Sequence, residues 1–263
     1  MKQKRKKLQR LTKILLGIFG VVILGCLIYF PGRQTPIAFT LATGIGVGRL
    51  QLRVDQMEEK AIKGEAFTEQ DTVFLKNLYS CFAKGGRLTI VLRQSSQMMG
   101  RYLARSGEDL KTAPRIFVNS TPVQDQMALL RKKIIADAQS PDNLRALYSS
   151  DVFYMGDPMF FDSFVGLYFG RVTATPGRPA DGKLTIRWRA ECPWEWPSYA
   201  SLFEKYGAYH AQCFPLPNAL SVAFGPQHCL EIDDGLGGHL VNLGIAKPFL
   251  VWSAWAEQIE MKQ

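Results

Sequence analysis

The segment VGLYFGRVTATPGRPADGKLTIRWR, residues 165–189, decides the fold class of this chain. Apolar side chains occupy every second position near its two ends, namely Val165, Leu167, Phe169, Leu184, Ile186 and Trp188. A period of two is typical of β-strands, and the Gly, Pro and Asp residues of 175–182 favour a turn between them. The segment therefore predicts an antiparallel hairpin, and residues 249–259 predict a third strand.

Helical signals precede the hairpin. Thr68 stands before an acidic first turn, and apolar residues then recur at helical spacing up to Gly85. We expect further helices at residues 88–104, 123–138 and 140–148, with a short extended piece at 115–118. Helices followed by strands indicate an α+β fold, with a helical first half and a small antiparallel sheet in the second half.

Length and charge exclude several classes of protein. With 263 residues, of which 47% are hydrophobic and 21% charged, the chain can bury a core, so it is neither disordered nor collagen-like. The formal net charge is +9, but residues 1–13 contain seven basic residues and no acidic one. The remaining 250 residues therefore carry a charge of only +2, and we expect no nucleic-acid partner.

Residues 14–30, ILLGIFGVVILGCLIYF, contain no charged side chain. A helix of this length spans about 25 Å, close to the hydrocarbon thickness of a bilayer. These features predict a single transmembrane helix in contact with the lipid bilayer, with the basic tail 1–13 in the cytoplasm. Residues 31–263 would then lie on the periplasmic side of a bacterial inner membrane.

Two alternatives use the same residues. The stretch Ile23-Leu24-Gly25-Cys26 is similar to a bacterial lipobox, in which the cysteine is acylated, but the apolar run continues beyond Cys26. A cleaved signal peptide needs an A-x-A-like pattern near Phe30, which the sequence lacks. An uncleaved anchor is therefore the preferred interpretation.

The chain after the anchor divides by composition. Residues 31–66 contain ATGIGVGR and are expected to form a glycine-containing linker beside the membrane. Residues 67–150 are expected to form a helical subdomain. Residues 151–263 are expected to form an aromatic-rich subdomain that contains the strands.

Four cysteines follow the predicted anchor, namely Cys81, Cys192, Cys213 and Cys229. In an oxidising compartment they could form two disulfides, with three possible connectivities. A Cys192–Cys213 bridge would close a loop of roughly 20 residues and contribute about 3 kcal/mol in the chain-entropy model. This pairing is preferred, and the alternative is that the cysteines are buried thiols.

Polar residues suited to catalysis gather in PQHCLEIDDGLGGHLVNLG, residues 226–244, and the candidates are His228, Asp233, Asp234 and His239. Imidazoles and carboxylates within reach of each other can act as acid and base or assist metal-dependent hydrolysis. No ligand spacing such as HExxH is present, so neither a metal nor a cofactor is assigned. The preferred interpretation is that Asp233 or Asp234 caps a helix.

A second candidate is the aromatic loop of residues 192–218, with Trp194, Trp196, Tyr199, Tyr206 and Tyr209. Flat aromatic side chains in a proline-stiffened loop could bind an envelope glycan or a peptide. In an extended segment Trp194 and Trp196 would share one face. The alternative is that these side chains form a core at one end of the sheet.

The leading hypothesis is a membrane-anchored protein whose exported domain binds an envelope component or a partner protein without catalysis. The alternative is an envelope-acting hydrolase, with or without metal assistance, centred on residues 228–239. A type II glycosyltransferase is a third option. Binding is preferred over catalysis because the hydrolase signatures GxSxG and SxxK are absent from the sequence.

Overall fold

The computed structural model describes residues 20–21, 23–30, 32–43, 45–87, 93–140, 143–156, 167–196, 199, 211–215 and 229–261. The chain forms two compact units, and each unit is built from two separate stretches. Unit 1 combines Met1–Gly85 with Trp196–Ile245. Unit 2 combines Gly86–Glu195 with Ala246–Gln263. The chain is α+β, as predicted.

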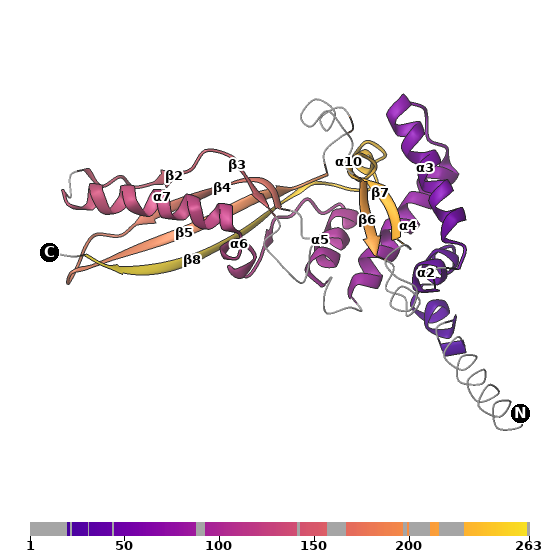
Figure 1. Cartoon of the computed structure of the whole chain (residues 1–263), viewed down its shortest axis with the longest axis horizontal. Helices are drawn as coiled ribbons and strands as arrows, with labels where there is room; N and C mark the ends of the chain where they lie inside the picture. Colours follow the sequence, from indigo (N-terminus) through magenta and orange to yellow (C-terminus); the bar gives the residue numbers. More distant parts are fainter. Residues whose placement is uncertain are drawn as a thin grey trace, which may run out of the picture. The chain divides into compact units, whose positions relative to one another are not determined.

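Unit 1 is mainly helical (Figure 1). Its helices are α2 (Gln34–Thr43), α3 (Val47–Lys63), α4 (Glu69–Arg87) and α10 (Asp234–Asn242), and its strands are β6 (Ala211–Pro215) and β7 (Cys229–Asp233). The two strands form an antiparallel pair. Helix α3 packs against both β7 and α10, so it lies beside the outer edge of this small sheet.

Helix α4 begins where the sequence predicted. The Thr68 hydroxyl accepts a hydrogen bond from the Asp71 N–H (3.2 Å), and Asp71 Oδ2 accepts one from the Thr68 N–H (3.1 Å). Arg53 and Lys60 of α3 contact the same carboxylate at 2.6 and 2.7 Å. Burial alone would raise the pKa of Asp71, but hydrogen bonds from Lys60 and Thr68 lower it to about 2. The cap of α4 therefore also attaches α3.

Residues 31–66, expected to form a linker, contain α2 and α3. Gly46 (φ 82°) precedes α3 and Gly64 (φ 68°) follows it, and both adopt the left-handed conformation that favours glycine. These two glycines thus mark the ends of a helix.

No helix in the described part of the chain is long and apolar enough to cross a membrane, which contradicts the transmembrane helix predicted at residues 14–30. Residues 20–21 and 23–29 are helical, whereas residues 1–19 and 22 lie outside the described residues. The predicted bilayer contact, inner-membrane location and periplasmic placement rested on that helix and lose their basis.

The predicted Cys192–Cys213 disulfide is also wrong, because Cys26, Cys81 and Cys192 are buried thiols outside any disulfide. Cys192 belongs to a strand of unit 2 and Cys213 to β6 of unit 1, although the two are close in sequence. Burial raises the pKa of Cys81 to about 12, so this thiol stays protonated and unreactive at neutral pH.

Unit 2 contains a six-stranded mixed sheet. Its helices are α5 (Arg93–Ala104), α6 (Arg115–Val118) and α7 (Thr121–Ala138), and its strands are β1 (Leu110–Lys111), β2 (Tyr148–Ser149), β3 (Phe153–Gly156), β4 (Leu167–Pro176), β5 (Lys183–Trp194) and β8 (Phe249–Glu260). The strand order is β1-β8-β5-β4-β2, and β3 also pairs with β4. The predicted hairpin is confirmed as β4–β5 and the third strand as β8. The sheet is not purely antiparallel, because β1 runs parallel to β8.

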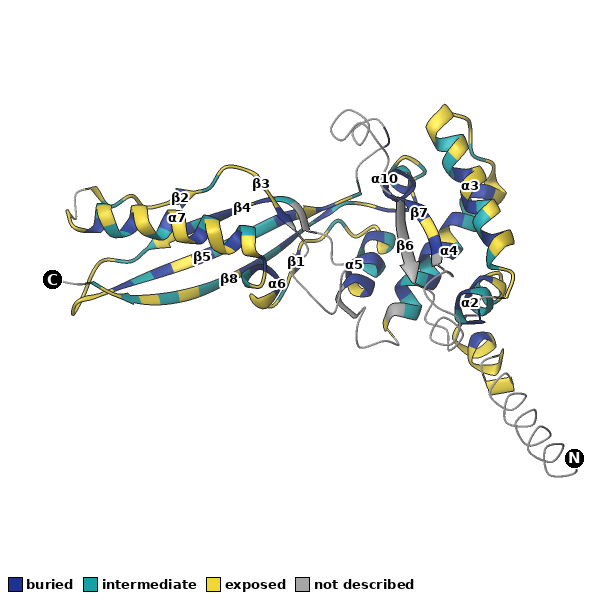
Figure 2. Cartoon of the chain, viewed as in Figure 1, coloured by how far each residue is buried: buried dark blue, intermediate teal, exposed yellow. Residues whose placement is uncertain are grey.

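One face of this sheet is packed and the other is open (Figure 2). Helix α7 contacts β2, β3 and β4 on the packed face. On β5 the buried side chains are Leu184, Ile186, Trp188, Ala190, Cys192 and Trp194, and the residues between them are half-buried or exposed. The Trp188 indole donates to Glu257 on β8 (3.0 Å), and Arg131 of α7 pairs with the same carboxylate (2.9 Å). This arrangement joins the helix to the sheet.

Two short segments differ from their predicted structure. Residues 115–118 form helix α6 rather than an extended piece, because Pro114 accepts hydrogen bonds from the N–H groups of Phe117 and Val118, both at 2.9 Å. The predicted helix at 140–148 is absent from its described residues, which end in β2. Tyr148 is buried there, pairs with Ala174 of β4, and donates to Asp137 (2.8 Å).

Candidate functional site

The predicted Asp233 and Asp234 lie where β7 passes into α10. Asp233 is the N-cap of α10, and its Oδ1 accepts a hydrogen bond from the Gly235 N–H (3.3 Å). Asp234 lies in the first turn and is buried. Both carboxylates are therefore placed where negative charge stabilises a helix, as in the capping interpretation.

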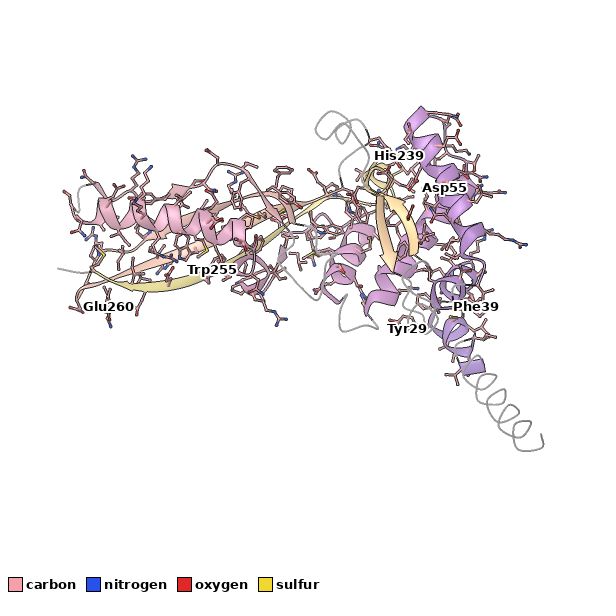
Figure 3. The ribbon with its side chains drawn as sticks, in the orientation of Figure 1. Tyr29, Phe39, Asp55, His239, Trp255 and Glu260 are labelled. Atoms are coloured by element: carbon pink, nitrogen blue, oxygen red, sulfur yellow. The ribbon has the colours of Figure 1, made fainter. Side chains whose placement is uncertain are left out.

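His239 lies further along α10 (Figure 3). Its ring packs on Phe67 with centroids 4.6 Å apart, and burial lowers its pKa. His228, the fourth candidate, lies outside the described residues. Within the described ranges no three His, Cys, Asp or Glu side chains are grouped to hold a metal ion.

Glu58 of α3 is a titratable residue that the sequence reasoning missed. Its Oε1 accepts a hydrogen bond from the Asp233 N–H (2.6 Å). Burial, together with the negative charges of Asp233, Asp55 and Glu231, raises the pKa of Glu58 to about 7. A sequence signal exists in the polar spacing of Gln51, Asp55 and Glu58, which places the three residues on one helical face.

Gln51, two turns before Glu58, completes the contact with β7. Its side-chain amide donates to the Glu231 carbonyl and its carbonyl accepts from the Glu231 N–H, both at 2.8 Å. The side chains of Gln51 and Glu58 thus pair with the outer edge of β7 as a neighbouring strand would. This arrangement closes the edge of the small sheet.

The aromatic loop packs inward wherever it is described. Trp194 is buried, and its ring lies 5.5 Å from that of Phe249 and 5.4 Å from that of Tyr102. Trp196 is half-buried, with its ring 5.4 Å from that of Tyr79. These contacts favour the core interpretation over an outward platform.

Two glycines of α10 make room for aromatic rings. A β-carbon at Gly237 would overlap the ring of Trp196, and one at Gly235 would overlap the ring of Tyr199, which is buried. The glycine-rich stretch therefore serves packing. Tyr206 and Tyr209, the other predicted binding residues, lie outside the described residues.

The open face of the sheet in unit 2 presents a different candidate site. Basic side chains from three strands lie on it, namely Lys111 of β1, Arg171 of β4, and Lys183, Arg187 and Arg189 of β5. Cross-strand register places Arg187 opposite Ala256 and Arg189 opposite Ala254 of β8. The small alanines leave these guanidinium groups accessible from the side of β8.

Two acidic side chains lie near these cations, Glu191 on β5 and Glu260, which is opposite Lys183 on β8. Glu191 bridges Arg171 (3.2 Å) and Arg189 (2.9 Å) on the same face. Lys183 and Arg187 are exposed, and neither forms an ion pair with a residue that the structure describes. The ring of Trp252 is covered by Arg189 (4.5 Å to the centroid) and Lys111 (5.2 Å). The open face is therefore a basic surface carried by three neighbouring strands and β1 of the sheet.

No protein-family model, curated protein or solved structure matches this chain.

Proposed function

We propose that this chain is a non-catalytic binding protein, and that its open face binds an acidic segment of a partner protein. The observation that carries the proposal is the row of basic side chains on β1, β4 and β5, of which Lys183 and Arg187 have no acidic neighbour within 4.0 Å among the described residues. Complementary charge raises the rate and the specificity of protein association.

The chemistry of the surface favours carboxylates. Three of the five cations are arginines, whose planar guanidinium groups match carboxylates in a bidentate manner. A single-stranded nucleic acid would need accessible aromatic faces for base stacking. The ring of Trp252 lies among the cations but is already covered by Lys111 and Arg189. An acidic polypeptide is therefore the better fit.

This proposal keeps the partner binding that was predicted from the sequence, but moves the binding site from the aromatic loop to the open face of the sheet. The aromatic residues Trp194 and Trp196 pack inward, whereas the side chains of Lys183 and Arg187 point to solvent. The hydrolase alternative stays a prediction, because His228 lies outside the described residues.

The test uses the full chain and a fluorescein-labelled peptide of alternating glutamate and threonine, ten residues long. Lys183→Gln combined with Arg187→Gln should weaken binding about tenfold, since each lost ion pair is worth roughly 0.5 to 1 kcal/mol. Fluorescence anisotropy measures the change. The matched control is Lys132→Gln with Lys133→Gln, two exposed lysines of α7. Equal loss in both double variants would contradict a specific site.

A second arm of the experiment separates the class of partner. An oligothymidylate of six nucleotides carries five phosphodiester charges, matching the five glutamates of the peptide, but no carboxylates. Binding of the peptide should be tighter, and both affinities should fall as salt increases. Tighter binding of the oligothymidylate through Lys183 and Arg187 would assign the open face to nucleic acid and overturn the proposal.

A further inference from the structure

The direction of the peptide groups along β8 follows from its hydrogen bonds. The Trp252 carbonyl accepts a hydrogen bond from the Thr112 N–H (2.8 Å), and the Leu250 N–H donates to Asp109 (3.2 Å). The backbone N–H and C=O groups of even-numbered residues therefore point away from β5. The Met261 N–H donates to the Gly182 carbonyl (2.7 Å), so the backbone N–H and C=O groups of odd-numbered residues point toward β5. This alternation is the rule for a paired strand.

Among the residues that the structure describes, none pairs with the outer edge of β8 over Ala254–Glu260. Ala254, Ala256, Gln258 and Glu260 direct their N–H and C=O groups outward, and all four residues are exposed. The pairing with β1 ends at Thr112, and no described residue contacts this outer row of peptide groups through a hydrogen bond. A strand of about seven residues, roughly 24 Å long, would fit along it.

This stretch lacks two of the usual protections of an edge strand, and its one exposed charge is Glu260 at the end. Residues 254–260, AWAEQIE, contain no proline and no lysine. Glu257 faces the packed side, where it contacts Arg131 and Trp188. Figure 3 shows Trp255 and Glu260 along this strand, which borders the sheet beyond β1. The edge is therefore suited to accept another strand.

The neighbouring charges indicate what such a strand would carry. Arg189 lies opposite Ala254 and Arg187 opposite Ala256, on the open face. Side chains of an added strand would lie next to these alanines on the same face, and the alanines are too short to separate them from the two arginines. Carboxylates at alternate positions would pair with both cations.

We infer that an acidic segment of the partner protein adds to the outer edge of β8 as an extended strand. The inference rests on the proposed function and specifies its binding mode. Main-chain hydrogen bonds supply affinity in such a complex, and the alternate side chains supply specificity. The segment would therefore be recognised by its acidic residues at every second position.

The test is Ala256→Pro, compared with Ala256→Ser as the matched control. Proline removes the outward N–H at residue 256 and places a ring against an incoming strand, while the hydrogen bonds to β5 use other residues. Binding of the glutamate–threonine peptide should weaken about tenfold or more for Ala256→Pro and change little for Ala256→Ser. Far-UV circular dichroism and melting temperature verify the fold of both variants.

Two outcomes would overturn the inference while leaving the proposed function intact. The first is unchanged binding to Ala256→Pro together with weak binding to the Lys183→Gln, Arg187→Gln variant. The second is that the peptide fails to slow amide exchange at Ala254, Ala256 and Gln258 of the unmodified chain, a measurement that does not depend on how the proline variant folds. If both Ala256→Pro and the Lys183→Gln, Arg187→Gln variant bind the peptide as tightly as the unmodified chain, the proposed function itself is contradicted.

A second copy of the chain is the competing occupant of this edge. Sedimentation of the unmodified chain without peptide distinguishes the two. A monomer at micromolar concentration is expected. A dimer that Ala256→Pro dissociates would assign the edge to self-association and overturn the inference.

Discussion

The two sheets differ in how their outer edges are treated. In unit 1, the side chains of Gln51 and Glu58 pair with the peptide groups of Glu231 and Asp233 on β7. In unit 2, the outward peptide groups of β8 from Ala254 onward have no hydrogen-bond partner in the described part of the chain. An edge closed by its own chain contributes to stability, whereas an open edge is available to a partner.

The difference has a local cause. Helix α3 carries polar side chains at helical spacing beside β7. Beside β8, the chain leaves the sheet after Thr112, since Pro114 has no N–H with which to continue a ladder and the next residues form α6. The edge of β7 is closed because a helix with polar side chains lies beside it. No helix of this kind lies along Ala254–Glu260 of β8 among the described residues.

Amide exchange should show the largest contrast between the two edges. Without a partner, the amides of Glu231 and Asp233 should exchange about a hundredfold more slowly than those of Ala254 and Ala256, because only the first two donate to protein acceptors. Exchange followed by NMR or mass spectrometry measures the ratio. Similar rates at both edges would show that the Gln51 and Glu58 contacts open readily in solution.

Matched glutamine truncations should show a smaller contrast. Gln51→Ala leaves the N–H and C=O of Glu231 without their partner and should lower the free energy of unfolding by about 2 kcal/mol. Gln258→Ala, on the exposed edge of β8, should change it by less than about 0.5 kcal/mol. Urea unfolding measures both variants. A comparable loss for Gln258→Ala would mean that the β8 edge is occupied in the isolated chain.

The pH dependence of unit 1 should show the smallest effect. The pKa of Glu58 is about 7 in the folded chain and 4.5 in an unperturbed glutamate. Between these values the folded state binds more protons than the unfolded state, so the free energy of unfolding falls as pH rises from 4.5 to 7 and stays low above it. Since Glu58 is only half-buried, about 1 to 2 kcal/mol is expected.

Glu58→Gln should remove this slope, because glutamine keeps an oxygen acceptor for the Asp233 N–H but does not titrate. The charged groups that act on Glu58 are Asp55 on α3 and Glu231 and Asp233 on β7. Unfolding curves at pH 5 and pH 8 measure the change. The exposed neighbour Glu59→Gln is the control and should keep the slope. A slope that survives Glu58→Gln would assign the titration to another group.

Sequence reasoning succeeded where a local pattern is sufficient. The N-cap at Thr68 predicted α4, and the helix expected at residues 123–138 is α7. It failed for residues 115–118 and 140–148, because segments this short take their structure from their neighbours, as Tyr148 does through its contact with Asp137. The sequence identified Trp196 and Tyr199 as notable aromatic residues. Their inward packing depends on Gly237 and Gly235, which leave room for the rings.

The sequence by itself determined the α+β class, the hairpin of β4 and β5, and the long strand β8, because alternation of apolar residues is a property of neighbours along the chain. Tertiary structure alone decided that each unit combines two distant stretches, that Cys192 stays a thiol, and that Glu58 titrates near neutrality. It also decided that β7 is closed and β8 open. The reason is that hydrogen-bond partners and the burial of charge are set by residues far apart in sequence, such as Gln51 and Glu231, which no local pattern connects.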